Sequence, residues 1–313
     1  MKTFSSLNTD EKEILSLSRR RQKEIQQFIF FKLFPKIFKQ SIRQTKHFRE
    51  WYRIPMNYVR IMELPLTIEL LDLNIKQAIL DISSPKLLPL YLAVSGYQKL
   101  TISDLLDYFV EDFKSFSQEF TISPKLDVFD ATNIPYDDRT FDRVFSVSVF
   151  EHIPDFGDID AVREVARVLK PRGIFVLTLP ASKNYMEEWV INHNFYWPGY
   201  TRDDGSVFYQ RRYNEQSIRE RFGNLGLEIE DIIFIAEHPI KPSVLNENGK
   251  LLHNDSYVRD LWPLKVANKL PKAPLLPYLL YSSLSERYHY LTRNSEDENI
   301  RQVAVKLRRL ATI

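Results

Sequence analysis

The sequence predicts an α/β protein built on a doubly wound, mostly parallel β-sheet. Five short apolar runs, rich in β-branched residues, suit strands that are buried on both faces of a parallel sheet. Helical patterns separate consecutive runs, which implies right-handed crossovers between parallel strands. The five expected strands cover residues 77–83, 99–105, 126–132, 141–149 and 173–181.

Amphipathic helical patterns fill the intervals between these strands. They cover residues 85–95, 107–119 and 158–170. The third pattern is the clearest, because Ile159, Val162 and Leu169 share one helical face. Residues 170–173, Lys-Pro-Arg-Gly, combine basic side chains with helix breakers, so we expect the helix to end there.

A reversed pair of strands is expected at the C-terminal end of the fold. A helix over residues 214–226 leads into a strand over residues 227–237, and residues 302–309 form a last strand that pairs with it in antiparallel fashion. The connection between the two strands is far longer than an ordinary loop. We therefore expect the Pro-, Tyr- and Leu-rich residues 237–297 to be an irregular insertion that acts as a lid or a substrate-binding element.

The bulk composition is that of an ordinary globular protein. Of 313 residues, 44% are hydrophobic and 27% are charged, which suits one large domain or two small ones. The first part of the chain has helical patterns only. We expect a helical N-terminal extension over residues 1–75 and one sheet-containing domain over residues 76–313. A net charge of +2 gives no overall field that would attract nucleic acid, and no nucleic-acid partner is expected.

The chain has no cysteine, which excludes disulfides, thiolate metal sites and a cysteine nucleophile. We see no signal peptide at the N-terminus, and no apolar run approaches the roughly 20 residues of a membrane span. These features predict a cytoplasmic protein. His193, His238 and His253 lack partners at metal-ligand spacing, so we expect no metal site.

Acidic and polar residues follow the ends of successive strands. Ligands of open parallel sheets bind outside the carboxyl ends of the strands, so these residues are expected to meet in one cleft. Acidic side chains at several strand ends suit a ligand with several hydroxyl and amino donors, such as an adenosine. The residues are Asp81 and the turn 83–86, then Asp104, then Asp130 and Ala131, and finally Val149, Glu151 and His152.

An ordered series of motifs resembles the class I S-adenosylmethionine-dependent methyltransferases of the small-molecule type. The series runs LDISS, TISDL, DVFDATNIPYDDRTFDRVFSVSVFEHIPD and AVREVARVLKPRGIFVLTLP, and covers roughly residues 76–181. The resemblance implies a Rossmann-like fold with a reversed last strand and S-adenosyl-L-methionine as the cofactor. It also implies an enzyme that transfers a methyl group to a small-molecule acceptor, for which we expect a sugar, a lipid-linked molecule or a natural product.

The resemblance assigns cofactor-binding roles by position. Asp81 stands where the family's acidic residue supports the methionine-binding loop, and Asp104 where a carboxylate takes both ribose hydroxyls. Asp130 and Ala131 stand where a side chain and a backbone amide read the adenine. The plainer alternatives are that Asp104 caps the next helix and that Asp130 is a turn residue.

The residues after the fourth strand are expected at the reactive end of the cofactor. The resemblance places Val149, Glu151 and His152 there. His152 is the candidate catalytic residue, because a histidine can act as general base toward a hydroxyl, which favours oxygen as the acceptor atom. Alternatively, His152 packs against the substrate and only positions it.

The opening turn departs from the family pattern E/D-x-G-x-G-x-G. Residues 81–87 read Asp-Ile-Ser-Ser-Pro-Lys-Leu, and Ser83, Ser84 and Lys86 are expected to bind the cofactor. Ser84 as N-cap and Pro85 at the first helical position predict a helix start that faces the methionine carboxylate, where Lys86 would add charge. The missing glycines also fit a catalytically inactive, methyltransferase-like binding protein. A nicotinamide-dependent oxidoreductase is disfavoured, since its glycine-rich turn is equally absent.

Two further stretches suggest interactions. Residues 184–213 are dense in Tyr, Trp, His and Asn, and we expect them either to face the substrate or to form a strand and turn that pack over the sheet. Residues 19–49 contain ten basic residues and one acidic residue, interleaved with Ile, Leu and Phe. Such a helix either packs its Phe stripe on the core or makes peripheral contact with an anionic membrane.

Overall fold

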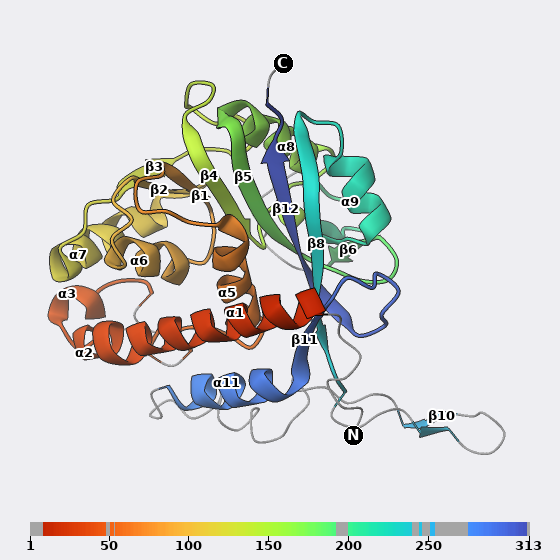
Figure 1. Ribbon diagram of the computed structural model, residues 1–313, viewed down its shortest axis with the longest axis horizontal. Coiled ribbons are helices and arrows are strands. Elements are labelled where there is room, and N and C mark those ends of the chain that lie inside the picture. The colour runs from red at the N-terminus through yellow and green to blue at the C-terminus, as the bar shows by residue number, and fades with distance from the viewer. Residues whose placement is uncertain are drawn as a thin grey trace.

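The computed structural model describes residues 9–47, 51–52, 54–191, 200–239, 244–245, 251–253 and 275–311. At its centre lies an eight-stranded mixed sheet with the strand order β11-β8-β12-β5-β4-β1-β2-β3 (Figure 1). The doubly wound, Rossmann-like sheet that the sequence predicts is therefore confirmed.

Five parallel strands form the core of the sheet. They are β1 (Ile79–Ile82), β2 (Leu100–Asp104), β3 (Lys125–Val128), β4 (Phe141–Val147) and β5 (Leu169–Pro180). β1 pairs with β2 on one side and with β4 on the other. Across the sheet, β1, β2 and β3 follow one another toward one edge, and β4 and β5 lie toward the other edge. The strand order therefore reverses beside β1, and ligands of such sheets bind at this switch point.

The C-terminal strands reverse the direction of the sheet. β12 (Ile300–Arg309) lies between β5 and β8 (Leu227–Glu237) and is antiparallel to both. Val303, for example, pairs with Leu179 on one side and Phe234 on the other. The predicted antiparallel pairing of the last two long strands is confirmed.

Part of the region from 237 to 297 is regular, contrary to the prediction of an irregular insertion. α11 (Leu276–Tyr288) leads directly into β11 (His289–Thr292), which pairs with the outer edge of β8. The pairing satisfies backbone groups that would otherwise stay open at the sheet edge. The short strands β9 (Val244–Leu245) and β10 (Leu251–His253) pair with each other, and the rest of 240–274 lies outside the described residues. A lid in this region stays a prediction.

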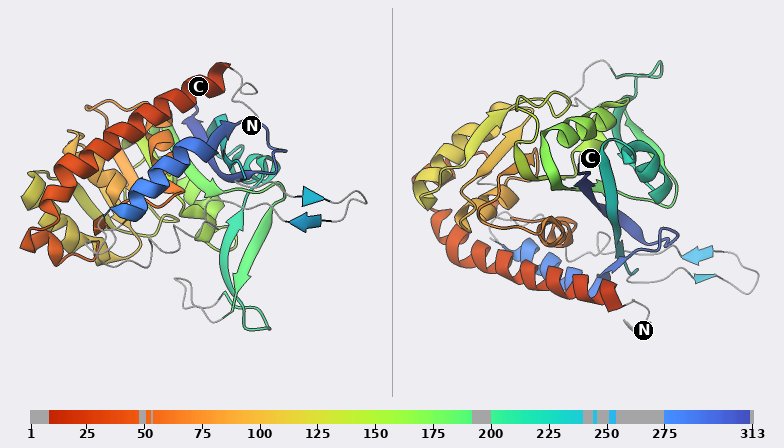
Figure 2. Two further views of the ribbon diagram at one scale, coloured as in Figure 1. Left: turned by 90° about the horizontal axis from the view of Figure 1, so that it is seen from below. Right: turned by 45° about the horizontal axis from the view of Figure 1, so that its top comes forward.

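Helices cover both faces of the sheet (Figure 2). One face packs on α5 (Arg60–Leu71), α6 (Leu87–Val94) and α7 (Val110–Phe120), the last preceded by a 3-10 turn, η3 (Asp107–Phe109). The other face packs on α8 (Gly157–Val168) and α9 (Glu215–Phe222). Val162 and Val165 of α8 are fully buried, as the amphipathic pattern predicts.

Two element boundaries differ from the prediction. β3 ends at Val128 rather than at residue 132, because the Asp130 carboxylate accepts hydrogen bonds from the backbone and hydroxyl of Thr132 and turns the chain. α8 ends at Val168, and residues 170–173 belong to the start of β5 instead of ending the helix. Arg172 adopts a left-handed φ of 63°, which bends this first part of the strand.

The N-terminal segment packs on the same hydrophobic cluster as one sheet face. α1 (Thr9–Gln27) continues through a π-helical turn, η2 (Phe28–Leu33), into α2 (Phe34–Lys36), and α3 (Gln40–Arg43) follows. Ile25, Ile29 and Leu33 are buried against the core, whereas Phe31 and Phe38 are exposed, so the expected packing of a Phe stripe on the core is met only in part. The division of the chain at residue 75 stays a prediction. No helix of the described ranges has both the length and the apolar composition that a membrane crossing requires.

Candidate functional site

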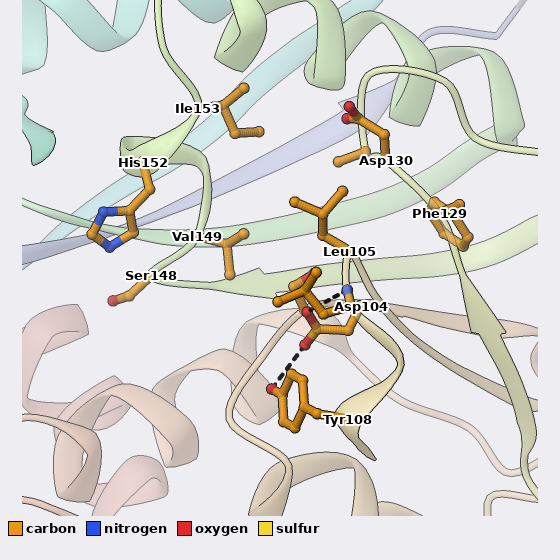
Figure 3. A pocket seen from close by; sticks show the side chains of 12 residues that line it. Asp104, Leu105, Tyr108, Phe129, Asp130, Ser148, Val149, His152 and Ile153 are labelled. Carbon is orange, nitrogen blue, oxygen red and sulfur yellow. Dashed lines mark hydrogen bonds between the residues drawn. The ribbon is translucent and has the colours of Figure 1, made fainter. Parts of the chain in front are cut away.

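A pocket lies at the carboxyl ends of β1, β2, β3 and β4 (Figure 3). It is lined by Ser83, Asp104, Leu105, Leu106, Tyr108, Phe129, Asp130, Ala131, Ser148, Val149, His152 and Ile153. Its cavity volume is about 240 Å³, somewhat below the ~300–1,000 Å³ of typical ligand pockets, and one side is open to solvent. Figure 3 shows His152 and Phe129 on opposite sides of it.

The structure brings six of the predicted site residues together in this pocket. They are Ser83, Asp104, Asp130, Ala131, Val149 and His152. The other four do not line it and are almost fully buried in the protein interior: Asp81, Ser84, Lys86 and Glu151. The sequence did not indicate six further lining residues, although each stands within four residues of a predicted one: Leu105, Leu106, Tyr108, Phe129, Ser148 and Ile153.

Asp104 ends β2 and presents its carboxylate at the pocket. Its Oδ2 atom accepts a hydrogen bond from the Tyr108 hydroxyl at 3.0 Å and lies 2.8 Å from the Lys86 ammonium. Its Oδ1 atom accepts only a long hydrogen bond, 3.5 Å from the backbone N–H of Leu106, among the contacts that the structure describes. This oxygen therefore keeps acceptor capacity for a donor in the pocket.

Lys86 lies in the protein interior, and this corrects the expectation that it adds charge toward a ligand. Its side chain is 1% exposed, and its ammonium donates to the Ser103 carbonyl at 2.9 Å. The same ammonium lies 3.9 Å from Asp81, so it sits between the carboxylates of Asp81 and Asp104. The cation balances two buried negative charges and does not occupy the pocket.

Asp81 is fully buried, and burial raises its pKa to about 7. The Lys86 ammonium and the hydrogen bonds from Ser84 oppose that rise. One carboxylate oxygen, Oδ1, accepts a hydrogen bond from the Ser84 backbone at 3.2 Å. The other oxygen, Oδ2, has no hydrogen-bond partner among the described residues and lies 3.9 Å from the ammonium.

The turn after β1 keeps a left-handed conformation without glycine. Ser83 stands at the first glycine position of the family pattern and has φ 55°, a region that favours glycine. The prediction that Ser84 caps the following helix is wrong: α6 begins at Leu87, and the Ser84 hydroxyl instead accepts a hydrogen bond from the Val147 backbone of β4. The hydroxyl thus ties the turn to the neighbouring strand.

His152 lies on the pocket wall with its side chain one-third exposed. Its Nδ1 atom lies 2.7 Å from the backbone carbonyl of Tyr209. A carbonyl only accepts hydrogen bonds, so Nδ1 carries the proton, and in the neutral ring Nε2 has a free lone pair. Burial lowers the pKa of His152 below its usual value, which keeps the ring neutral near pH 7.

Glu151 is the buried neighbour of His152. It is 1% exposed, and burial raises its pKa to about 8, so the side chain is largely protonated at neutral pH. Its Oε1 atom lies 3.8 Å from Nε2 of His152, and no residue in the described part of the chain forms a hydrogen bond with its Oε2 atom. A neutral Glu151 does not stabilise a charged imidazolium, which agrees with the lowered pKa of His152.

A helix from the N-terminal region supports the pocket, which the sequence did not indicate. Arg60, at the start of α5, donates to the Ser148 hydroxyl at 2.6 Å and is paired with the buried Glu63. The Ser148 hydroxyl in turn donates to Glu63 at 2.8 Å. Ser148 has a left-handed φ of 51°, and these contacts hold the bend that leads from β4 to His152.

The aromatic stretch 184–213 forms a hairpin beside the pocket. β6 (Met186–Val190) pairs with β7 (Val207–Arg212), and residues 192–199 lie outside the described residues. β7 supplies the Tyr209 carbonyl that binds His152. In the ranges that the structure describes, no three His, Asp or Glu side chains stand close enough together to hold a metal ion.

Comparison with known proteins assigns the domain. Residues 80–177, from β1 to β5, match the family model described as a methyltransferase domain. The chain carries a class I S-adenosylmethionine-dependent methyltransferase domain. Binding of S-adenosylmethionine or S-adenosylhomocysteine is typical of this family.

Solved structures of methyltransferase fold are similar to this chain. The YcgJ protein from Bacillus subtilis is 17% identical, with 80% of this chain and 99% of that chain covered and a TM-score of 0.48. The [4+2]-cyclase SpnF is 15% identical over 80% of this chain and 81% of its own, with a TM-score of 0.45. The 1,6-didemethyltoxoflavin-N1-methyltransferase from Burkholderia thailandensis is 10% identical, with 75% of this chain and 71% of that chain covered and a TM-score of 0.42. The family match, and not these structures, assigns the methyltransferase domain.

Proposed function

We propose that this methyltransferase transfers a methyl group to a hydroxyl oxygen of a small polar acceptor, with His152 as the general base. The observation that carries the proposal is the hydrogen bond from His152 Nδ1 to the Tyr209 carbonyl. It leaves Nε2 unprotonated in the same pocket as the Asp104 carboxylate. A sugar, a lipid-linked molecule or a natural product with a free hydroxyl would suit such a base.

The residues of the pocket fit S-adenosylmethionine. Asp104 Oδ1 has free acceptor capacity for ribose hydroxyls, and this observation supports a cofactor site despite the missing glycines. Leu105 and Phe129 offer apolar surface for the adenine, next to Asp130 and Ala131. When bound, the cofactor supplies an electrophilic methyl group on a positively charged sulfur.

The roles of the chain's own residues follow from their positions. His152 Nε2 would take the hydroxyl proton while the acceptor oxygen forms its bond to the methyl carbon, and the electron pair of the broken carbon–sulfur bond stays on sulfur. Val149 and Ser148 would shape the wall at which the acceptor meets the methyl group. Much of the rate enhancement in such a transfer comes from holding the two reactants in line.

An acceptor screen tests the proposal. The protein is incubated with S-adenosylmethionine labelled in its methyl group and with sets of hydroxyl, amine and thiol compounds, beside a His152→Gln variant. We expect transfer to a hydroxyl compound, a loss of at least a hundredfold in the variant, and S-adenosylhomocysteine binding within threefold of wild type. Transfer only to amines or thiols, or full activity of the variant, would contradict the assignment.

The missing glycines favour a second candidate, a methyltransferase-like protein that binds partners without transferring methyl groups. This candidate predicts no binding of S-adenosylmethionine or S-adenosylhomocysteine at millimolar concentration. The position of Lys86 argues against this second candidate. Because the Lys86 side chain is buried and does not line the pocket, the glycine-free turn does not fill the space where a cofactor would bind. For both candidates we propose a cytoplasmic location, which the lack of cysteine suits.

A further inference from the structure

We propose that the outer face of residues 31–46 docks on a membrane surface that is rich in anionic lipid. The face, here called the basic aromatic strip, consists of Phe31, Lys32, Pro35, Phe38, Lys39, Arg43 and Lys46, all of them exposed. The proposal concerns where the protein binds, and it does not depend on the acceptor or on His152.

The orientation of the strip is set by the opposite side of the same helices. Ile29, Leu33 and Ile37 are fully buried in the core cluster, so the segment cannot rotate to hide its outer face. Phe31 consequently keeps 77% of its surface exposed, and Phe38 keeps 55%. Two large aromatic side chains seven residues apart therefore expose apolar surface beside the basic side chains of the strip.

The charge of the strip is of one sign. The sequence has no acidic residue from 25 to 49, although the whole chain has a net charge of only +2. The acidic side chains that pack against the segment from α7 are occupied within the protein: Glu119 accepts a hydrogen bond from Ser41, and Asp112 is buried against His47. Lys32, Lys39, Arg43 and Lys46 therefore present a local positive surface beside exposed aromatic rings.

The first turns of α11 extend the apolar part of this face. Figures 1 and 2 show α11 beside the N-terminal helices, and the Leu275 backbone N–H donates to the Tyr52 carbonyl. The Tyr52 ring lies 6.1 Å from that of Phe38, so the two segments adjoin. Leu276 and Leu279 are exposed by 37% and 44%.

A lipid surface is the partner that satisfies both features. Basic side chains are attracted to anionic headgroups, and exposed aromatic and leucine side chains gain by entering the boundary between headgroups and acyl chains. A nucleic acid would use the charges and stack on Phe rings, but it offers nothing to Leu276 and Leu279.

Flotation with vesicles tests the proposal on the full chain. Neutral vesicles contain phosphatidylcholine alone, and anionic vesicles have about a third of it replaced by phosphatidylglycerol. Wild-type protein is expected to float with anionic vesicles at low salt, at least tenfold more than with neutral ones, and to be partly released by high salt. No binding to anionic vesicles at low salt would overturn the proposal.

Three double variants separate the contributions. Phe31→Ser with Phe38→Ser removes the aromatic contact, and Lys32→Glu with Lys39→Glu reverses charge; each is expected to lower anionic-vesicle binding at least tenfold. Lys76→Glu with Lys99→Glu, a matched control on exposed residues that precede β1 and β2, is expected to stay within twofold. Equal losses in the control and in the strip charge variant would overturn the proposal.

Folding and the competing partner are controlled in the same experiment. Circular dichroism and the thermal midpoint check that each variant is folded, so that a loss of binding is not a loss of structure. Single-stranded RNA of mixed sequence is added as a competitor. RNA that binds more tightly than the vesicles, and displaces the protein from them, would assign the strip to nucleic acid and overturn the lipid assignment.

Discussion

Replacing Lys86 with methionine removes the ammonium that lies between two buried carboxylates. The Lys86 nitrogen is 2.8 Å from Asp104 and 3.9 Å from Asp81, and its side chain is 1% exposed. At an effective dielectric constant of about 20, the Coulomb attraction of the ammonium to each carboxylate is several kcal/mol, and part of it offsets the free-energy cost of burying the lysine. Breaking a buried pair by removing one partner costs about 3–5 kcal/mol, and we expect the Lys86→Met variant to lose that much stability.

The loss should depend on pH in a defined direction. Burial raises the pKa of Asp81 to about 7 in the folded protein, above its value of 3.8 in the unfolded chain. The folded state therefore binds the proton more tightly, and the stability contribution of this carboxyl falls as pH rises from about 4 to 7. Without the ammonium the pKa rises further, so the deficit of the variant should be larger at pH 8 than at pH 5.

Urea denaturation measures the loss, with Lys99→Met as the control at an exposed position. The control should stay within about 0.5 kcal/mol of wild type, and Lys86→Met should lower the thermal midpoint by about 10 °C. Adding Asp81→Asn to the variant should restore part of the stability, because it removes the unpaired carboxylate. A Lys86→Met protein within about 1 kcal/mol of wild type, or no recovery on adding Asp81→Asn, would show that the ammonium does not stabilise the two carboxylates.

Three further predictions concern single residues. Ser83→Gly should raise the free energy of unfolding by about 1 kcal/mol, because glycine adopts the left-handed φ of 55° without strain; a lower thermal midpoint would contradict this. Burial lowers the pKa of His289 to about 3, so the free energy of unfolding should fall as pH drops below 6.5, by about 2 kcal/mol at pH 5. Urea denaturation of a His289→Gln variant should not show this pH-dependent loss. Nitrogen-15 NMR of His152 should show a proton on Nδ1 and a pKa below 6.5, and an Nε2–H tautomer would exclude the proposed base.

The parts of the fold that the sequence predicts are those set by local burial. Both ends of β8, Leu227 and Glu237, coincide with the predicted strand, because a strand buried along its second half leaves an unbroken apolar run. The ends of β3 and α8 differ, because they depend on an Asp130–Thr132 turn and on the pairing of β5 with β4. The strand β11 escaped prediction, since only its pairing with the edge of β8 makes it a strand.

The sequence predicts the site residues that directly follow the ends of strands. It does not predict the residues that reach the site only through contacts between distant parts of the chain. Asp104 and His152 line the pocket because chain order alone brings strand ends together at a switch point. Arg60 reaches Ser148 across 88 residues of sequence, and no periodicity indicates that contact. Lys86 points inward to the Ser103 carbonyl and the two carboxylates, and its place in the sequence does not indicate that direction.

We expect the glycine-free turn to form a cofactor site, because Lys86 lies outside the pocket and Asp104 lines it. Calorimetric titration with S-adenosylmethionine and S-adenosylhomocysteine tests this most directly, with wild type, Asp104→Ala and the exposed neighbour variant Asp107→Ala side by side. We expect micromolar binding by wild type and Asp107→Ala, and a loss of at least tenfold in Asp104→Ala. No binding of either ligand by wild type at millimolar concentration would contradict it.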